Sequence, residues 1–292
     1  MRTADAIRPV VFDRHNQRVK IYEIDSASEI SSSSLVRDAE RQGFTKVVVY
    51  VKNDDSTGWD DLGFVREGTI RGYFADGNDA TIRSHFVDRE RGVNPRGVEH
   101  DEYVGIARAC TSSEPRLADG FSCEIGTSED SEAIASLMEG IFTEYPDPIS
   151  PEWVVEALEQ GTRHFRIVRN PAGEVIASAS AEIDIRNRSA ELTDCATLPE
   201  ARGRGLMRFI LRALEKDMIG GYGISDLYTL ARSDELSMNC AFAKLGWTYT
   251  GRLVNNCRMP NGWESMNIWC RRESENRGGC FPSSISGSHT TR

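Results

Sequence analysis

The feature that most constrains the fold is a glycine-punctuated turn between an expected strand at residues 190–198 and an expected amphipathic helix at 205–218. The turn reads Arg202-Gly203-Arg204-Gly205-Leu206-Met207. Glycine lets the backbone approach a ligand closely, and the first amides of a helix are unpaired and carry about half a positive charge. We therefore expect this turn to bind an anionic group such as a diphosphate.

The spacing of the turn separates it from two common phosphate sites. It lacks the GxxxxGK[ST] pattern, which excludes a P-loop, and it is not a GxGxxG followed by a ribose-binding acid, so a dinucleotide-binding fold is not favoured. A glycine turn before a helix also serves as a plain connection. Its meaning therefore depends on the segments around it.

Charge and composition exclude several classes of protein. The 45 acidic and 35 basic residues leave a net charge of −10, which repels nucleic acid and attracts a cationic amine, although solubility alone also explains it. We expect no membrane span, because no apolar run approaches the roughly 20 residues required. Seven irregular cysteines, scattered histidines and the lack of a secretory signal predict reduced thiols, no metal and a cytoplasmic protein.

The pattern along the chain predicts two modules and a tail. Residues 1–118 are expected to form an N-terminal α/β module with a charged, Gly/Pro-rich linker at 88–120, and residues 273–292 a disordered tail. The N-terminal module has an expected helix at 35–42 ended by Gly43 and strands at 46–52 and 63–74.

The second module, residues 119–272, has the expected order β α α β β β α β α β β. The expected strands are 121–125, 164–169, 174–184, 190–198, 226–231, 247–255 and 264–272, and the expected helices are 128–142, 151–160, 205–218 and 234–245.

The turn resembles the pyrophosphate signature Arg-x-x-Gly-x-[Gly/Ala] of GCN5-related N-acetyltransferases (GNAT). A downstream Asn239-x-x-Phe242-Ala243-Lys244-Leu245-Gly246-Trp247 follows in the same order as in that superfamily. The resemblance implies an α/β GNAT fold, a mostly antiparallel mixed sheet flanked by helices, that uses acetyl-CoA. Met207 departs from the small residue usual at the last position.

Further segments resemble the beta-lysine N6-acetyltransferase family. They are Ala231-Arg232-Ser233, Ser237-Met238-Asn239, Gly251-x-Leu253-Val254-Asn255-Asn256, Glu264-Ser265-Met266-Asn267-Ile268-Trp269 and, near the N-terminus, Leu62-Gly63-Phe64-x-x-Glu67-Gly68-x-Ile70-x-Gly72-Tyr73-Phe74. The match covers about 20 to 272. It implies acetylation of the side-chain amine of β-lysine by direct attack through a tetrahedral intermediate, which yields the compatible solute N6-acetyl-β-lysine.

The resemblance also implies the residues of the site. It places cofactor contacts at Ala196, Thr197, Leu198, Arg202, Gly203, Arg204, Gly205, Leu206, Met207, Asn239 and Lys244, with the backbone of 196–198 as the oxyanion donor. Acceptor contacts are expected at Tyr145, Asn255 and Asn256, although turn formation alone would also explain these asparagines.

Catalysis requires a base, because an alkyl amine of pKa about 10.4 is almost fully protonated near pH 7. Glu191 and Asp194 lie on the strand before the turn, but residues three apart face opposite sides of a regular strand. At most one faces the substrate unless the strand bulges. The resemblance favours Glu191, which lies where some relatives carry their catalytic glutamate; a solvated strand carboxylate is the alternative.

The acid that protonates the leaving thiolate is missing from its usual place, where relatives have a tyrosine and this chain has Phe242. Tyr228 or Tyr249 are substitutes, and core packing explains each of them as well. A thiol of pKa about 8.5 is also a tolerable leaving group without an acid.

Leu62-Gly63-Phe64-x-x-Glu67-Gly68 echoes Leu245-Gly246-Trp247-x-x-Thr250-Gly251. We therefore hypothesise that the N-terminal module is a degenerate half-copy of the acetyltransferase fold, without a cofactor site, that scaffolds, forms a homodimer or covers the acceptor. Two readings of the whole chain remain open beside the β-lysine enzyme: acetylation of another small amine or a protein lysine, and an inactive acyl-CoA-binding sensor.

Overall fold

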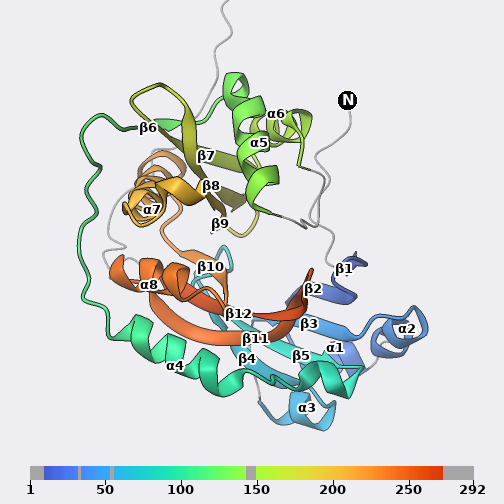
Figure 1. The fold of residues 1–292 in the computed structure, drawn as a ribbon. Helices are drawn as coiled ribbons and strands as arrows, with labels where there is room; N and C mark the ends of the chain where they lie inside the picture. Colours follow the sequence, from blue (N-terminus) through green and yellow to red (C-terminus); the bar gives the residue numbers. More distant parts are fainter. Residues whose placement is uncertain (1–9, 32–33, 53–55, 143–148, 272–292) are drawn as a thin grey trace, which may run out of the picture.

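The computed structural model describes residues 10–31, 34–52, 56–142 and 149–271, whose strands join in a single mixed sheet (Figure 1). Tyr145 and the tail 273–292 lie outside these residues. The sheet order is β1-β2-β3-β5-β4-β11-β12-β10-β9-β8-β7-β6. The strands are β1 Val10–Asp13, β2 Arg18–Ile24, β3 Lys46–Val51, β4 Val65–Ile70, β5 Ala80–Phe86, β6 Ser122–Ile125, β7 Arg163–Arg169, β8 Val175–Asp184, β9 Ser189–Thr197, β10 Leu227–Arg232, β11 Thr248–Met259 and β12 Gly262–Arg271.

The described helices cover both faces of this sheet (Figure 1). They are α1 Ala27–Ser31, α2 Leu35–Arg41, α3 Ser56–Asp61, α4 Gly97–Arg108, α5 Ser131–Ile141, α6 Pro151–Glu159, α7 Leu206–Asp217 and α8 Leu236–Lys244. In the acetyltransferase module every predicted helix and strand is confirmed, with ends that differ by a few residues. The predicted mixed, mostly antiparallel sheet is confirmed as well, because among the strands that the structure describes only the pairs β2–β3 and β9–β10 are parallel.

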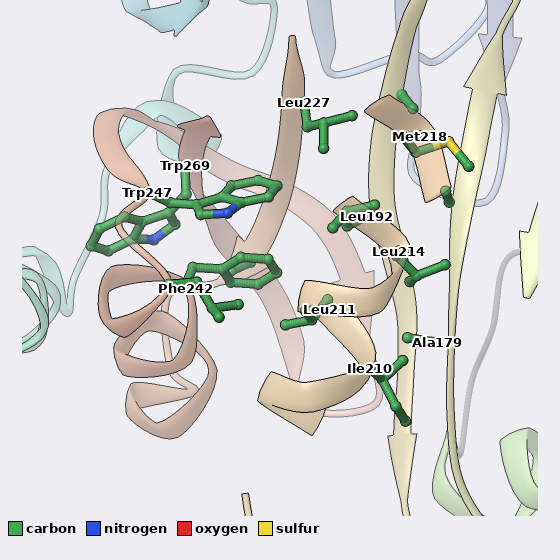
Figure 2. Packing of buried hydrophobic residues seen from close by; sticks show 14 of the residues in the cluster. Ala179, Leu192, Ile210, Leu211, Leu214, Met218, Leu227, Phe242, Trp247 and Trp269 are labelled. Carbon is green, nitrogen blue, oxygen red and sulfur yellow. The ribbon is translucent and has the colours of Figure 1, made fainter. Parts of the chain in front are cut away.

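The helices of the acetyltransferase module pack on opposite faces of the sheet. Helix α7 covers one face, where Leu211 and Leu214 belong to the same apolar cluster as Phe242, Trp247 and Trp269 (Figure 2). Helices α5 and α6 cover the other face in a separate apolar cluster. Both faces of β7, β8 and β9 are therefore covered, and most of the residues of β8 are buried.

The prediction of a linker at 88–120 is wrong for residues 97–108. This segment is helix α4, which packs against α8. Its buried residues His100, Val104 and Ala107 recur at helical spacing on one face. The exposed apolar residues Val98 and Ile106, mixed with exposed charged residues, obscured that stripe in the sequence.

The two halves of the chain share one topology. The run β2, α1–α2, β3, α3, β4, β5 follows the same order as β9, α7, β10, α8, β11, β12. Within the sheet, the order β2-β3-β5-β4 in the first half matches β9-β10-β12-β11 in the second, and each set begins with a parallel pair. Helix α3 and strand β5 were not anticipated from the sequence.

The halves meet where Gly68 of β4 pairs with Gly251 of β11. A Cβ on Gly251 would lie 2.3 Å from the carbonyl oxygen of Glu67, so the two backbones approach too closely for a side chain. Beside this contact, Lys46 Nζ lies 2.8 Å from Glu67 Oε2 and donates to the Val254 carbonyl at 2.8 Å. Burial lowers the pKa of Lys46 to about 8, although Glu67 opposes this effect.

Candidate active site

Strands β9 and β10 separate shortly after they meet. Their pairing is limited to Leu227 with Ala190 and Tyr228 with Glu191. Beyond Glu191, the edge of β9 that faces β10 has no strand partner among the described residues. This opening lies directly before the glycine turn that begins helix α7.

A β-bulge interrupts β9 within the same stretch. Asp194 has a φ of +54°, and the register against β8 shifts between the pairs Ser180–Thr193 and Ser178–Ala196. Before the bulge, Leu192 packs in the cluster of α7, whereas after it Ala196 packs in the cluster of α5 and α6. The bulge thus exchanges the two faces of the strand.

The exchange brings both candidate carboxylates to one face, because Glu191 precedes the bulge and Asp194 lies within it. Their environments differ. Asp194 is buried, 2.7 Å from Arg163 Nη1, and accepts a hydrogen bond from Ser180 Oγ at 2.5 Å. Asp194 is therefore held as a counterion of Arg163, which is a structural position rather than that of a base.

Glu191 is half-buried and accepts no hydrogen bond from the described residues. Burial, followed by repulsion from Glu182 on β8, raises its pKa to about 7, while Lys20 and Arg163 oppose the rise. A carboxylate with that pKa can both take up and release a proton near neutral pH. Of the two predicted candidates, Glu191 has the properties of a general base.

The backbone amides of β9 alternate between two directions. Leu198 N–H donates to the Ile176 carbonyl at 3.0 Å and is therefore used within the sheet. In an antiparallel ladder the next residue points its amide the other way, so Thr197 N–H is directed toward the opening between β9 and β10. Of the three expected oxyanion donors at 196–198, only the Thr197 amide points toward the opening, because the Ala196 and Leu198 amides face β8.

The glycine turn has the geometry of an anion cradle. Gly203 and Gly205 have φ values of +78° and +76°, and a Cβ on either would meet open space. Helix α7 begins with the hydrogen bond from Phe209 N–H to the Gly205 carbonyl at 3.2 Å, so the amides of the residues before Phe209 point out of the start of the helix. The residues present thus fit a diphosphate.

Side chains of the turn support this fit. Arg202 and Arg204 are exposed, and the first turn of α7 holds no acidic residue. Leu206 is buried in the core and Met207 packs partly against it. The departure at Met207 is accommodated because this side chain faces the core rather than the turn.

Asn239 is fully buried, and its amide is used entirely within the protein. Nδ2 donates to the carbonyls of Arg232 and Glu235, both at 2.9 Å, and Oδ1 accepts from Asn267 Nδ2 and Trp269 Nε1. The side chain therefore has no free polar atom for the expected contact with the pantetheine arm. Asn239 instead joins helix α8 to strand β12.

Lys244 ends helix α8 and is half-buried. Its carbonyl accepts hydrogen bonds from Ser113 N–H at 3.0 Å and Ser112 Oγ at 3.1 Å, which fix the segment after α4. Phe242, which stands where relatives have a tyrosine, is buried in the core against Trp247.

Asn255 and Asn256 lie at the junction with the N-terminal module, not in the opening between β9 and β10. The Asn255 side chain donates to the carbonyls of Arg91 and Val93, both at 2.8 Å. The Asn256 carbonyl accepts from Arg18 Nη1 at 3.0 Å. The structure gives these predicted acceptor residues a role in holding an irregular part of β11.

Four tyrosines that the sequence did not single out as a group gather on the face of Glu191. They are Tyr22, Tyr50, Tyr73 and Tyr228, whose rings follow one another with centroid distances of 4.7, 5.3 and 6.0 Å. Three belong to the N-terminal module and Tyr228 is the β10 neighbour of Glu191. Tyr249, the other tyrosine considered as an acid, packs on Trp269 in the core.

The described part of the chain offers neither a metal site nor a membrane span. No three histidine, cysteine or acidic side chains gather there as ligands. None of its helices combines the length and apolarity needed to cross a bilayer.

Comparison with known proteins agrees with this arrangement. A family model described as the acetyltransferase (GNAT) family matches residues 132–247. The beta-lysine N(6)-acetyltransferase of Methanosarcina mazei is 34% identical over 250 residues, which cover 77% of this chain and 90% of that protein. The N-acetyltransferase YodP of Bacillus subtilis is 31% identical over 89% of this chain and 94% of its own length.

A second beta-lysine N(6)-acetyltransferase, from Methanococcus maripaludis, is 29% identical over 77% of this chain and 81% of that protein. Among solved structures, a spermidine N-acetyltransferase from Vibrio cholerae matches 52% of this chain and 94% of its own with 16% identity and a TM-score of 0.46. On the strength of the sequence relatives, the chain belongs to the beta-lysine N6-acetyltransferase family of GNAT enzymes and is an acetyl-CoA-dependent N-acetyltransferase.

Proposed function

We propose that the protein transfers the acetyl group of acetyl-CoA to the side-chain amine of β-lysine. The observation that carries the proposal is Glu191, a half-buried carboxylate of pKa about 7 beside the opening between β9 and β10. The names of two relatives that span most of the chain supply the acceptor. The anion cradle at Gly203 and Gly205 supports the choice of acetyl-CoA.

In the proposed reaction Glu191 accepts a proton from the substrate ammonium and passes it to water. The neutral nitrogen then attacks the thioester carbonyl, a C–N bond forms and the C–S bond breaks. As the C–S bond breaks, the Tyr228 hydroxyl donates its proton to the departing thiolate and is reprotonated by the excess proton of the attacking nitrogen, so the products are the amide and free CoA. Thr197 N–H is proposed to stabilise the oxygen that carries negative charge during the attack.

Tyr228 is the proposed proton donor to the thiolate. Burial, and then the charge of Glu191, raise the pKa of Tyr228 well above its ordinary value, so the phenol stays protonated. It neighbours Glu191 in the sheet, whereas Tyr249 is packed in the core. A thiol of pKa about 8.5 leaves without a strong acid, so this contribution is modest.

We also propose that the N-terminal module is a degenerate half-copy that binds no acetyl-CoA. Its strand order matches that of the second half, but the segment between β2 and β3 contains no Arg-x-x-Gly-x-Gly. One acetyl-CoA per chain is the expected stoichiometry, which titration calorimetry measures. A second site of comparable affinity would contradict this proposal.

The function is tested by following thiol release from acetyl-CoA with β-lysine, α-lysine and spermidine as acceptors, at pH 7.5 to 8.5. The proposal expects the highest kcat/KM with β-lysine. A higher value with another amine would replace the acceptor and leave the acetyltransferase intact. Binding of acetyl-CoA without turnover of any amine would instead favour a sensor.

A further inference from the structure

One face of the sheet runs continuously from the N-terminal module to Glu191. On β2, Val19 and Ile21 pack into the core under α1 and α2, so the alternating residues Lys20 and Tyr22 point to the opposite face. Tyr22 packs in the same cluster as Tyr228, which neighbours Glu191. Residues of β2 and of β9 therefore face a common space.

The sheet curls so that β2 approaches the hairpin between β8 and β9. The side chains of Glu23, at the end of β2, and Arg186, in that hairpin, form an ion pair across this space. The row of four tyrosines lies on the same face of the sheet, between β2 and Glu191. Tyr50 and Tyr73 are buried, Tyr22 and Tyr228 are half-buried, and no hydroxyl of the row is hydrogen-bonded to a described residue.

Side chains of opposite charge lie at the two ends of this face, acidic ones on β8 and β9 and a lysine on β2. Glu191 and Glu182 are cross-strand neighbours on β9 and β8. Lys20 of β2 is half-buried, and its Nζ lies 5.7 Å from the centroid of the Tyr22 ring. It forms no ion pair with a described residue, whereas Arg18 on the same strand is paired with Asp13 at 2.8 Å.

We propose that the N-terminal module supplies the carboxylate-binding half of the acceptor site, with Lys20 pairing the carboxylate of an amino-acid acceptor whose reacting amine lies at Glu191. The tyrosine rings would then contact the methylene chain between the two ends. A polyamine has no carboxylate for Lys20 and would be repelled by it. The inference rests on the proposed function and adds the residue that selects amino acids over plain diamines.

The test compares two acceptors that differ only in the carboxylate: β-lysine and 1,4-diaminopentane. The wild-type enzyme is expected to prefer β-lysine, and Lys20→Met to lower kcat/KM for β-lysine about 10- to 100-fold, mainly through KM, because a charge-assisted hydrogen bond is lost. The diamine should be unaffected or improved. Lys20→Arg keeps the charge and should retain the preference.

Lys216→Met is the matched control, because Lys216 lies on the outer surface of α7 with its side chain 72% exposed. Thermal unfolding of each variant checks that the fold is retained. If Lys20→Met lowers kcat/KM equally for both acceptors, or leaves the ratio of the two values unchanged, Lys20 does not bind the carboxylate. If the pH profiles for both acceptors shift in parallel, Lys20 instead tunes the pKa of Glu191. Absence of wild-type turnover with β-lysine would refute the proposed function and is recognised before any variant is made.

Discussion

Replacing Glu191 by glutamine should lower activity and raise stability at the same time. Because the pKa of Glu191 is raised, the ionised carboxylate has a higher free energy in the folded protein than in the unfolded chain. Glutamine keeps the shape of the protonated side chain and removes the charge. The variant thus tests whether the base is held under electrostatic strain in the folded enzyme.

The magnitude follows from the two pKa values. A pKa of about 7 in the folded state and 4.5 in the unfolded state corresponds to about 3 kcal/mol between the charged and neutral forms. Glu191 keeps some contact with water, which screens part of this energy. We expect the gain in unfolding free energy to be about 1 to 3 kcal/mol.

The sign depends on pH. Between pH 4.5 and 7 the folded wild type holds a proton on Glu191 that the unfolded chain has lost, so wild-type stability falls as pH rises through this window. Below it, wild type and Glu191→Gln should be nearly equal. Above it, the variant should be the more stable by the full amount.

Urea unfolding at about pH 5 and pH 8 measures this difference, with Glu159→Gln, an exposed carboxylate on α6, as the control. In parallel, kcat should fall about 10²- to 10⁴-fold in Glu191→Gln, and the wild-type rate should rise with pH through an apparent pKa near 7. A variant with full activity would remove Glu191 as the base. A stability difference that does not change between the two pH values would refute the electrostatic reasoning.

Three further substitutions test other parts of the structure. Gly205→Ala should weaken acetyl-CoA binding in calorimetry. Gly173→Ala, at a φ of +85° in a distant turn, should cause similar backbone strain without weakening that binding. Equal Kd values for acetyl-CoA in the two variants would argue against the anion cradle. Gly251→Ala should lower the Tm sharply because its Cβ would meet backbone at 2.3 Å, and Gly43→Ala, which meets open space, should lower it far less. Asn239→Ala should cost about 2 to 4 kcal/mol in urea unfolding, because several buried hydrogen bonds are lost, with little change in the KM for acetyl-CoA; the reverse pattern would restore the pantetheine contact.

Some features of the site needed the fold before they could be recognised. Asn239 matches a family position, but only the packing of β12 against α8 shows that Asn267 and Trp269 use its amide oxygen. Similarly, Asn255 and Asn256 end an expected strand, and their location away from the acetyltransferase opening depends on contacts with Arg91 and Arg18, far away in the chain.

The sequence by itself determined the glycine turn, the order of elements in the acetyltransferase module and the family, because these depend on local backbone sterics, hydrophobic periodicity and contiguous motifs. Only the tertiary structure decided the bulge at Asp194, which brings two carboxylates to one face, and the different environments that separate Glu191 from Asp194. It also decided that Lys20 and the row of four tyrosines lie on the same face of the sheet as Glu191. These features arise from strand pairing and burial between distant segments, which a single sequence does not encode as a local pattern.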